Sequence, residues 1–187
     1  MKLKKNEMLE HEKEECRYRE LMCPGCREKI QACKLPDHFV NCPQVKYKET
    51  RQHVELEETR TMHPACSRIA SDRPRVFKLT NSKNWFLLCA DVLDDKLVFY
   101  MKHYSGEKSK EKFNFNLKIF DQGNKQSRSL SGVQCTPFDM EVNDSRRKGF
   151  TLDISLEAME NMCYLPNTDD IYKYIWSTEI SLFKSYP

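Results

Sequence analysis

The chain of 187 residues contains only 5 glycines and no long apolar run, and these absences exclude several classes of protein. No Gly-rich phosphate loop, nucleophile elbow or H-E-x-x-H motif is present, so the sequence carries no common signature of an enzyme. No apolar stretch approaches the roughly 20 residues of a membrane-spanning helix. The first residues, MKLKKNEMLEHEKEEC, lack the apolar segment of a secretory signal. We therefore expect neither an enzyme nor a membrane protein.

The sequence also lacks a large excess of either positive or negative charge. The chain has 31 Lys and Arg residues against 28 Asp and Glu residues, and its net charge is +3. So small a net charge gives no electrostatic argument for a nucleic-acid partner. Apolar residues make up 39% of the chain and charged residues 32%, which is typical of a folded, soluble protein.

Cysteine, in contrast, is abundant, with 9 residues of which five lie in the first quarter of the chain. These five are Cys16, Cys23, Cys26, Cys33 and Cys42. A secreted disulfide framework would have a signal sequence and usually an even number of cysteines. We therefore expect a reducing compartment, the cytoplasm or alternatively the nucleus, and thiols that bind metal.

Four residues have the spacing of zinc ligands, in the pattern Cys23-x2-Cys26-x11-His38-x3-Cys42. A C-x-x-C turn brings two thiolates together. Positions i and i+4 lie on one face of a helix, and the first turn of such a helix can hold Pro36. Because zinc prefers four sulfur and nitrogen ligands in a tetrahedron, the pattern predicts a Zn²⁺ site. Cys33 falls between the two pairs, and we expect it to take no part.

A second, incomplete set lies upstream, His11-x4-Cys16. It has the histidine–cysteine half of a zinc finger without a cysteine pair before it. Two interpretations stay open. Either a longer parent protein supplies the missing cysteines, or both residues lie on the surface of a charged helix.

From Arg75 onward the sequence alternates apolar and polar residues, as half-buried antiparallel strands do. The clearest examples are FNFNLKIF (113–120) and GFTLDISL (149–156), and one helical turn is expected at 156–161. Short strands at regular spacing predict a mainly β fold, an antiparallel β-sandwich or barrel. The expected domains are a cysteine-rich region at 1–42, a polar connector at 43–74 and the β domain at 75–187.

The segment LEHEKEECRYRELMCPGC…LPDHFVNCP resembles the TRAF-type zinc finger, in which one finger runs into the next through a C-x-x-R-x-x-x-C-P link. Here that link runs from Cys16 to Pro24, and the resemblance favours His11 and Cys16 as a metal half-site. The order of features after Arg75 resembles the TRAF-like substrate-binding domain of the seven-in-absentia ubiquitin ligases. The resemblance therefore implies an eight-stranded antiparallel sandwich behind a zinc-finger module.

The resemblance also implies a function in ubiquitin signalling. Family members usually carry a RING domain before the fingers, but this sequence has no eight-ligand cross-brace. We therefore expect no ligase activity from this chain, which would act as the substrate-recognition or adaptor part. Seven-in-absentia relatives are dimers, so the resemblance admits a homodimer. The alternative is a C2HC finger that binds nucleic acid, although Pro36 shortens the helix that would read bases.

Protein or peptide partners are expected to bind the sandwich rather than the finger. The regularly alternating strands should be core, so the contact residues are expected in less regular segments, Trp85–Asp91 and Lys96–Tyr104. The aromatic residues Trp85, Tyr100 and Tyr104 have polar neighbours there and are the predicted contacts.

Overall fold

A computed structural model of the chain describes six stretches of residues and is mainly β. The described residues are 16–62, 69–70, 74–105, 111–121, 126–165 and 172–185. Three sheets are present, one of two strands and two of six. Among the described residues, no helix is long and apolar enough to cross a membrane.

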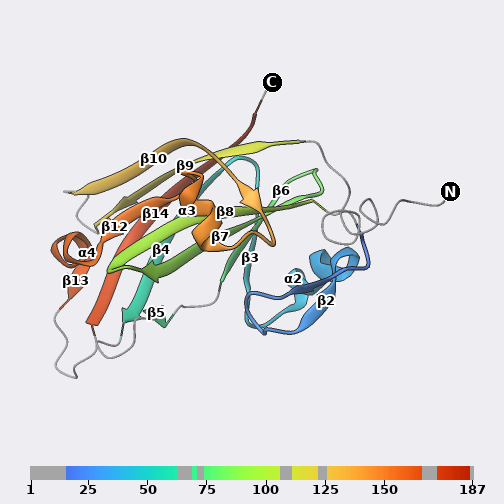
Figure 1. Cartoon of the computed structure of the whole chain (residues 1–187), viewed down its shortest axis with the longest axis horizontal. Coiled ribbons are helices and arrows are strands. Elements are labelled where there is room, and N and C mark those ends of the chain that lie inside the picture. The colour runs from blue at the N-terminus through green and yellow to red at the C-terminus, as the bar shows by residue number, and fades with distance from the viewer. Residues whose placement is uncertain are drawn as a thin grey trace.

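The small sheet belongs to an N-terminal module, residues 16–45, and the two large sheets form a two-sheet body, residues 46–185 (Figure 1). In the module, β1 (Glu20–Met22) pairs with β2 (Lys29–Gln31) in antiparallel register. A 3-10 turn, η2 (Ala32–Lys34), leads directly into helix α2 (Leu35–Asn41). The two strands and the helix are short, so the module needs support from other contacts.

One large sheet is built around the long C-terminal strand. Its strand order is β10 (Ser127–Gln134), β9 (Phe113–Phe120), β14 (Tyr172–Lys184), β4 (His53–Met62) and β5 (Ile69–Ala70), with β13 (Tyr164–Leu165) also beside β14. Its pairings are all antiparallel. The strand β14 is central, because β9 and β4 pair with its two edges.

The other large sheet is built around a hairpin of two ten-residue strands. Its strand order is β11 (Thr136–Pro137), β8 (Lys96–Ser105), β7 (Asn84–Leu93), β6 (Arg75–Leu79) and β3 (Lys46–Thr50), with β12 (Leu152–Ser155) also beside β8. The hairpin turns at Asp94 and Asp95, which have φ values of 48° and 57°. Such a two-residue turn matches the twist of the flanking strands, and it holds β7 and β8 in register along their whole length.

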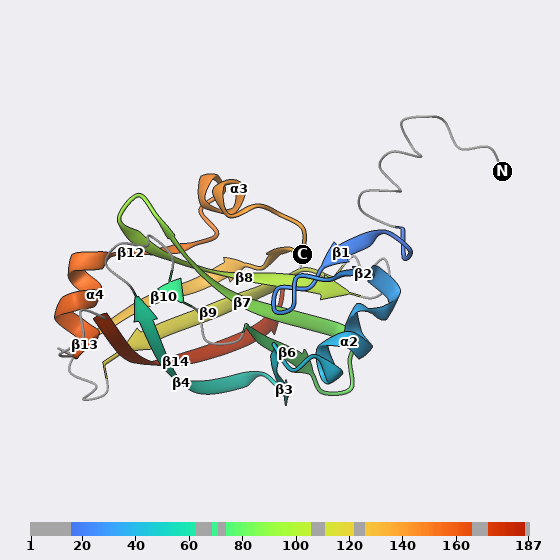
Figure 2. The ribbon, with the colours of Figure 1, turned by 90° about the horizontal axis from the view of Figure 1, so that it is seen from below.

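A single apolar core lies between the two large sheets, which form two layers in Figures 1 and 2. Phe86, Phe99 and Met101 reach it from one sheet and Phe115 and Ile180 from the other. The alternation predicted for 113–120 is confirmed, because every second residue of β9 is buried. The two-sheet body therefore has a core of its own, independent of the N-terminal module.

The prediction for 149–156 is confirmed in part. Only Leu152–Ser155 is a strand, in which Ile154 is buried, while Leu152 and Leu156 pack partly buried against the core. The chain then enters helix α4 (Leu156–Cys163), where a helical turn was expected. A second helix, α3 (Val142–Arg147), lies on the outer side of β7 and β8 (Figure 2).

Most of the described part of the predicted connector at 43–74 consists instead of strands of the body. Strand β3 pairs in parallel with β6, and β4 pairs with ten residues of β14. Both segments are rich in charge, but a strand is fixed by backbone hydrogen bonds to its neighbours as much as by its own side chains. The described strands accordingly outnumber the eight that were predicted.

A partly buried chain of polar side chains at the end of β7 and β8 predicts sensitivity to acid. Asn84 donates from Nδ2 to Glu111 (3.0 Å), so its Oδ1 accepts the Nε2–H of His103 (2.9 Å). His103 also stacks on Phe86, with ring centroids 5.0 Å apart. Burial lowers the pKa of His103 to about 4, so the folded protein resists protonation that the unfolded chain accepts.

The unfolding free energy should therefore fall as the pH drops from about 6.5 to about 4, by about 1 to 3 kcal/mol from this histidine. Urea unfolding of the wild type and of His103→Gln across this range measures the effect. The variant should lose less stability on acidification. An equal loss in both proteins would contradict the assignment.

Candidate metal centre

The first two cysteines of the predicted ligand set lie on a tight turn between β1 and β2. The backbone N–H of Cys23 donates to the carbonyl of Glu28 (2.9 Å), and the N–H of Arg27 donates back to the carbonyl of Cys23 (3.1 Å). Arg27 has a φ of 65°, which turns the chain back toward β2. This loop holds the Cys23 and Cys26 side chains on the same side.

The other two residues of the set come from α2 and its end. Pro36 occupies the first turn of this helix, where a missing N–H costs nothing. The helix ends as the N–H of Cys42 donates to the carbonyl of His38 (2.8 Å). His38 and Cys42 therefore lie one turn apart on the side that faces the cysteine turn.

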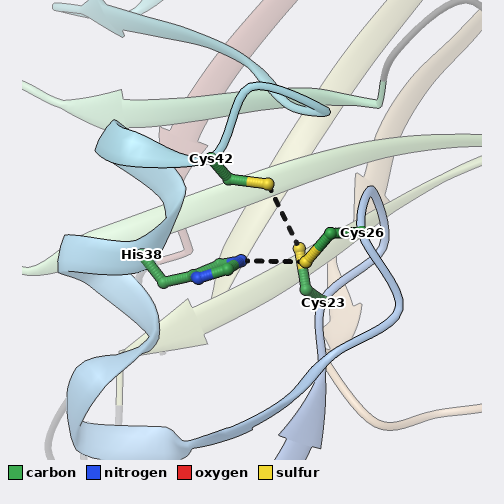
Figure 3. Close-up of side chains that lie close together, drawn as sticks. All are labelled: Cys23, Cys26, His38 and Cys42. Carbon is green, nitrogen blue, oxygen red and sulfur yellow. Dashed lines mark hydrogen bonds between the residues drawn. The ribbon is translucent and has the colours of Figure 1, made fainter.

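The structure brings the four predicted residues together, with their ligand atoms within 4.8 Å of one another (Figure 3). The Sγ atoms of Cys23 and Cys42 are 4.0 Å apart, and Cys26 Sγ lies 3.3 Å from His38 Nε2. A tetrahedral zinc ion, with bonds of about 2.0–2.3 Å, would place its ligands about 3.3–3.8 Å apart. The group could therefore hold a metal ion after only small movements.

The donor set restricts which ion would fit. Three thiols and one imidazole suit a soft or borderline metal, and they do not suit Mg²⁺ or Ca²⁺, which take oxygen ligands. Cys23 and Cys42 are buried, and burial raises the pKa of the Cys23 thiol to about 11. Metal binding must therefore displace a proton that this thiol otherwise keeps at neutral pH.

The remaining cysteines of the region stand apart from this group. Cys33 is exposed and is not among the four clustered residues. Cys16 is half-buried, and its carbonyl accepts the N–H of Arg19 (3.0 Å). His11 lies outside the described residues, so the second half-site stays a prediction.

The N-terminal module packs on the outer face of the sheet that contains β7 and β8. Leu35 and Phe39 of α2 share one buried apolar cluster with Trp85 and Tyr104. The Phe39 and Trp85 rings are 5.8 Å apart, and the Tyr104 hydroxyl donates to the carbonyl of Ala32. The module and the body thus meet across an apolar contact with one buried hydrogen bond.

The three residues that were predicted to contact a partner are buried, namely Trp85, Tyr100 and Tyr104. They are 5%, 4% and 4% exposed, respectively. Trp85 and Tyr104 lie under the module. Tyr100 lies beside it, where its hydroxyl donates to Asp91 Oδ2 (2.7 Å), and burial raises its pKa.

Tyr100 and Asp91 line a groove of about 510 Å³ between the module and the body. Sequence reasoning missed the groove residues that come from other segments, among them Met22 and Phe138. No local pattern indicates them, because they meet only through docking of the module.

Gly25, in the cysteine turn, should be sensitive to any side chain. A Cβ at this position would lie 2.5 Å from the carbonyl oxygen of Gln44 and 2.9 Å from Val45. Gly25→Ala should therefore weaken metal affinity about tenfold, because the turn must shift away from backbone atoms. Competition with a chelator measures this. At Gly132, in β10 of the body, a Cβ meets no atom within 4 Å, but the φ of 68° strains any side chain. Gly132→Ala should therefore lower the stability of the body and leave the metal affinity unchanged; equal effects on the affinity would contradict the steric argument.

Comparison of the chain with models of known protein families found no match, and comparison with curated proteins found none either.

Proposed function

We propose that this chain is a zinc-binding protein-interaction module that serves as the substrate-recognition or adaptor part of a ubiquitin-signalling protein. The main supporting observation is that the four candidate metal ligands lie in a module that packs on the outer face of a sheet, beside an open groove. We further propose that the two-sheet body is a TRAF-like sandwich. This proposal is supported by the resemblance of the cysteine region and by the two layers that share one core.

Zinc in this cluster would be structural. Four protein ligands complete a tetrahedral shell and leave no open position for a water or a substrate, unlike catalytic zinc sites with three protein ligands. Cys23, Cys26, His38 and Cys42 would hold the ion. Their part is to fix α2 against the cysteine turn, so that Leu35 and Phe39 face the body.

The alternative of a nucleic-acid-binding finger is less well supported. Helix α2 has seven residues, and its buried face, Leu35 and Phe39, packs on the body. Its exposed residues Asp37, Val40 and Asn41 include no cation. A helix that reads bases needs an exposed face with basic or amide side chains, and this helix has only one such residue.

The proposal predicts binding without ligase activity. Metal-loaded protein, cross-linked in cell extract, should capture ubiquitin-conjugation components or proteins that carry ubiquitin. With ubiquitin, activating enzyme and a panel of conjugating enzymes, the chain alone should assemble no ubiquitin chains, because its sequence has no RING cross-brace. Robust chain assembly, or capture of nucleic acid in place of protein, would contradict the proposal.

A further inference from the structure

We infer that the groove beside the N-terminal module binds an extended peptide segment in which Lys or Arg alternates with apolar residues. This inference rests on the proposed function, because it assumes that the chain recognises proteins, and it adds the chemistry of the recognised segment.

The floor of the groove is the outer face of the β7–β8 hairpin. Residues that point away from the main core line it, namely Leu87, Cys89, Asp91, Tyr100 and Lys102. Leu87 lies opposite Lys102 and Cys89 opposite Tyr100 in the antiparallel register. The floor is therefore a strip of strand pairs, with apolar positions next to charged ones.

Two further segments line the groove, β1 of the module and the chain leading to α3, and both lie on the outer side of this sheet (Figure 2). The module contributes Leu21 and Met22, and the other segment contributes Phe138. Leu21 is buried, but Met22 is 53% exposed. A flexible, exposed thioether beside a groove is suited to contact apolar side chains of varied shape.

The charges of the lining favour a cationic segment. Four carboxylates line the groove, Glu20, Asp91, Asp139 and Glu141, against the two cations Arg27 and Lys102. All four acidic residues are exposed. Asp139 and Glu141 line the groove from the segment between β11 and α3. The excess of carboxylates attracts Lys or Arg side chains and repels a phosphate backbone.

Some of this charge is already engaged within the protein. Glu20 forms a surface ion pair with Lys29 (3.4 Å), and Asp91 accepts the hydroxyl of Tyr100. The ammonium group of Lys102 lies 5.9 Å from the centre of the Tyr100 ring. Asp139 is therefore the residue of choice for testing the charge of the occupant.

The mixed lining of the groove favours an extended chain, because its floor is made of strand residues in which apolar and charged side chains lie next to each other. An extended segment points alternate side chains to opposite sides. Apolar residues would then contact Met22, Leu87 and Phe138, and the cations between them would face the carboxylates.

Three fluorescein-labelled hexapeptides test the inference by fluorescence anisotropy with metal-loaded protein. The first alternates leucine and lysine, the second has glutamate in place of lysine, and the third has serine in place of leucine. We expect the first to bind about tenfold or more tightly than either of the others. Equal binding of the glutamate or the serine peptide overturns the inference.

Asp139→Lys should weaken binding of the leucine–lysine peptide about tenfold, and Met22→Ser should weaken it as well. Glu157→Lys on α4 reverses the same charge outside the groove lining and should have no effect. Retained metal and unchanged Trp fluorescence show that each variant is folded. If Asp139→Lys and Glu157→Lys bind alike, the inference is wrong. If both variants still capture proteins from extract, the proposed function remains supported, and the partner binds at a site other than this groove.

Discussion

Cys23→Ser is expected to abolish tight metal binding and to unfold residues 16–42, while the two-sheet body stays folded. A structural zinc site contributes on the order of 10 kcal/mol to the folding of a small module, and Cys23 is the fully buried member of the group. The module has no other core of its own, because its apolar residues share a cluster with Trp85 and Tyr104 of the body. The body retains Phe99, Phe115 and the rest of its separate core.

Metal analysis and the emission of Trp85 measure this outcome. The chain has 2 tryptophans, so Trp176→Phe leaves Trp85 as the single reporter. Loss of the module uncovers Trp85 and should shift its emission to longer wavelength, while circular dichroism still reports a cooperatively unfolding β structure.

Cys33→Ser is the matched control, because Cys33 is exposed and lies in the same module. It should keep both the metal and the wild-type emission. Full metal content in Cys23→Ser, or collapse of the whole fold, would contradict the separation of module and body.

The clustered residues of the candidate site were predictable because their pattern is local. Cys23 and Cys26 share one turn, and His38 and Cys42 share one helical turn, so each pair needs only short-range geometry. The alternation of β9 was equally readable, because one face of this strand is buried and the other is not.

The strand β3 and the full length of β4 were not predicted, for a physical reason; only Val54 and Leu56 indicated one short strand within β4. Lys46–Thr50 and His53–Met62 are rich in charge, and neither segment has a plain apolar face in its sequence. They are strands because β6 and β14 provide partners for their backbone groups. Those partners are distant in sequence, and no local pattern encodes the pairing.

The sequence contains an indication that Trp85 and Tyr104 are buried, although both were predicted to contact a partner. Residues 84–88 of β7 are all buried, and four of them form the apolar run WFLL. A strand that is apolar on both faces is covered on both faces. The run thus indicated a second layer on the outer side of the sheet, although it could not identify that layer as the metal-binding module.

Phe39→Ala separates docking of the module from metal binding. The Phe39 side chain is 1% exposed and lies between Trp85 and Phe138, with ring centroids 5.8 Å and 5.9 Å away. Truncating a buried phenylalanine costs about 3–5 kcal/mol. Phe39 is not one of the clustered metal-binding residues, so the variant should keep its metal and lose most of the contact that holds α2 on the sheet.

The matched control is Val40→Ala, on the next residue of the same helix, because Val40 is 53% exposed. This change should alter stability by no more than about 0.5 kcal/mol. Amide exchange of α2 and β7, with metal content measured in parallel, distinguishes the two variants. In Phe39→Ala, exchange should accelerate in both elements although the metal stays bound, and Trp85 emission should shift as it does in Cys23→Ser.

Because the module also forms one wall of the groove, binding of the leucine–lysine peptide should weaken in Phe39→Ala and not in Val40→Ala. Unchanged exchange in Phe39→Ala would mean that the metal alone, rather than the aromatic contact, fixes the module.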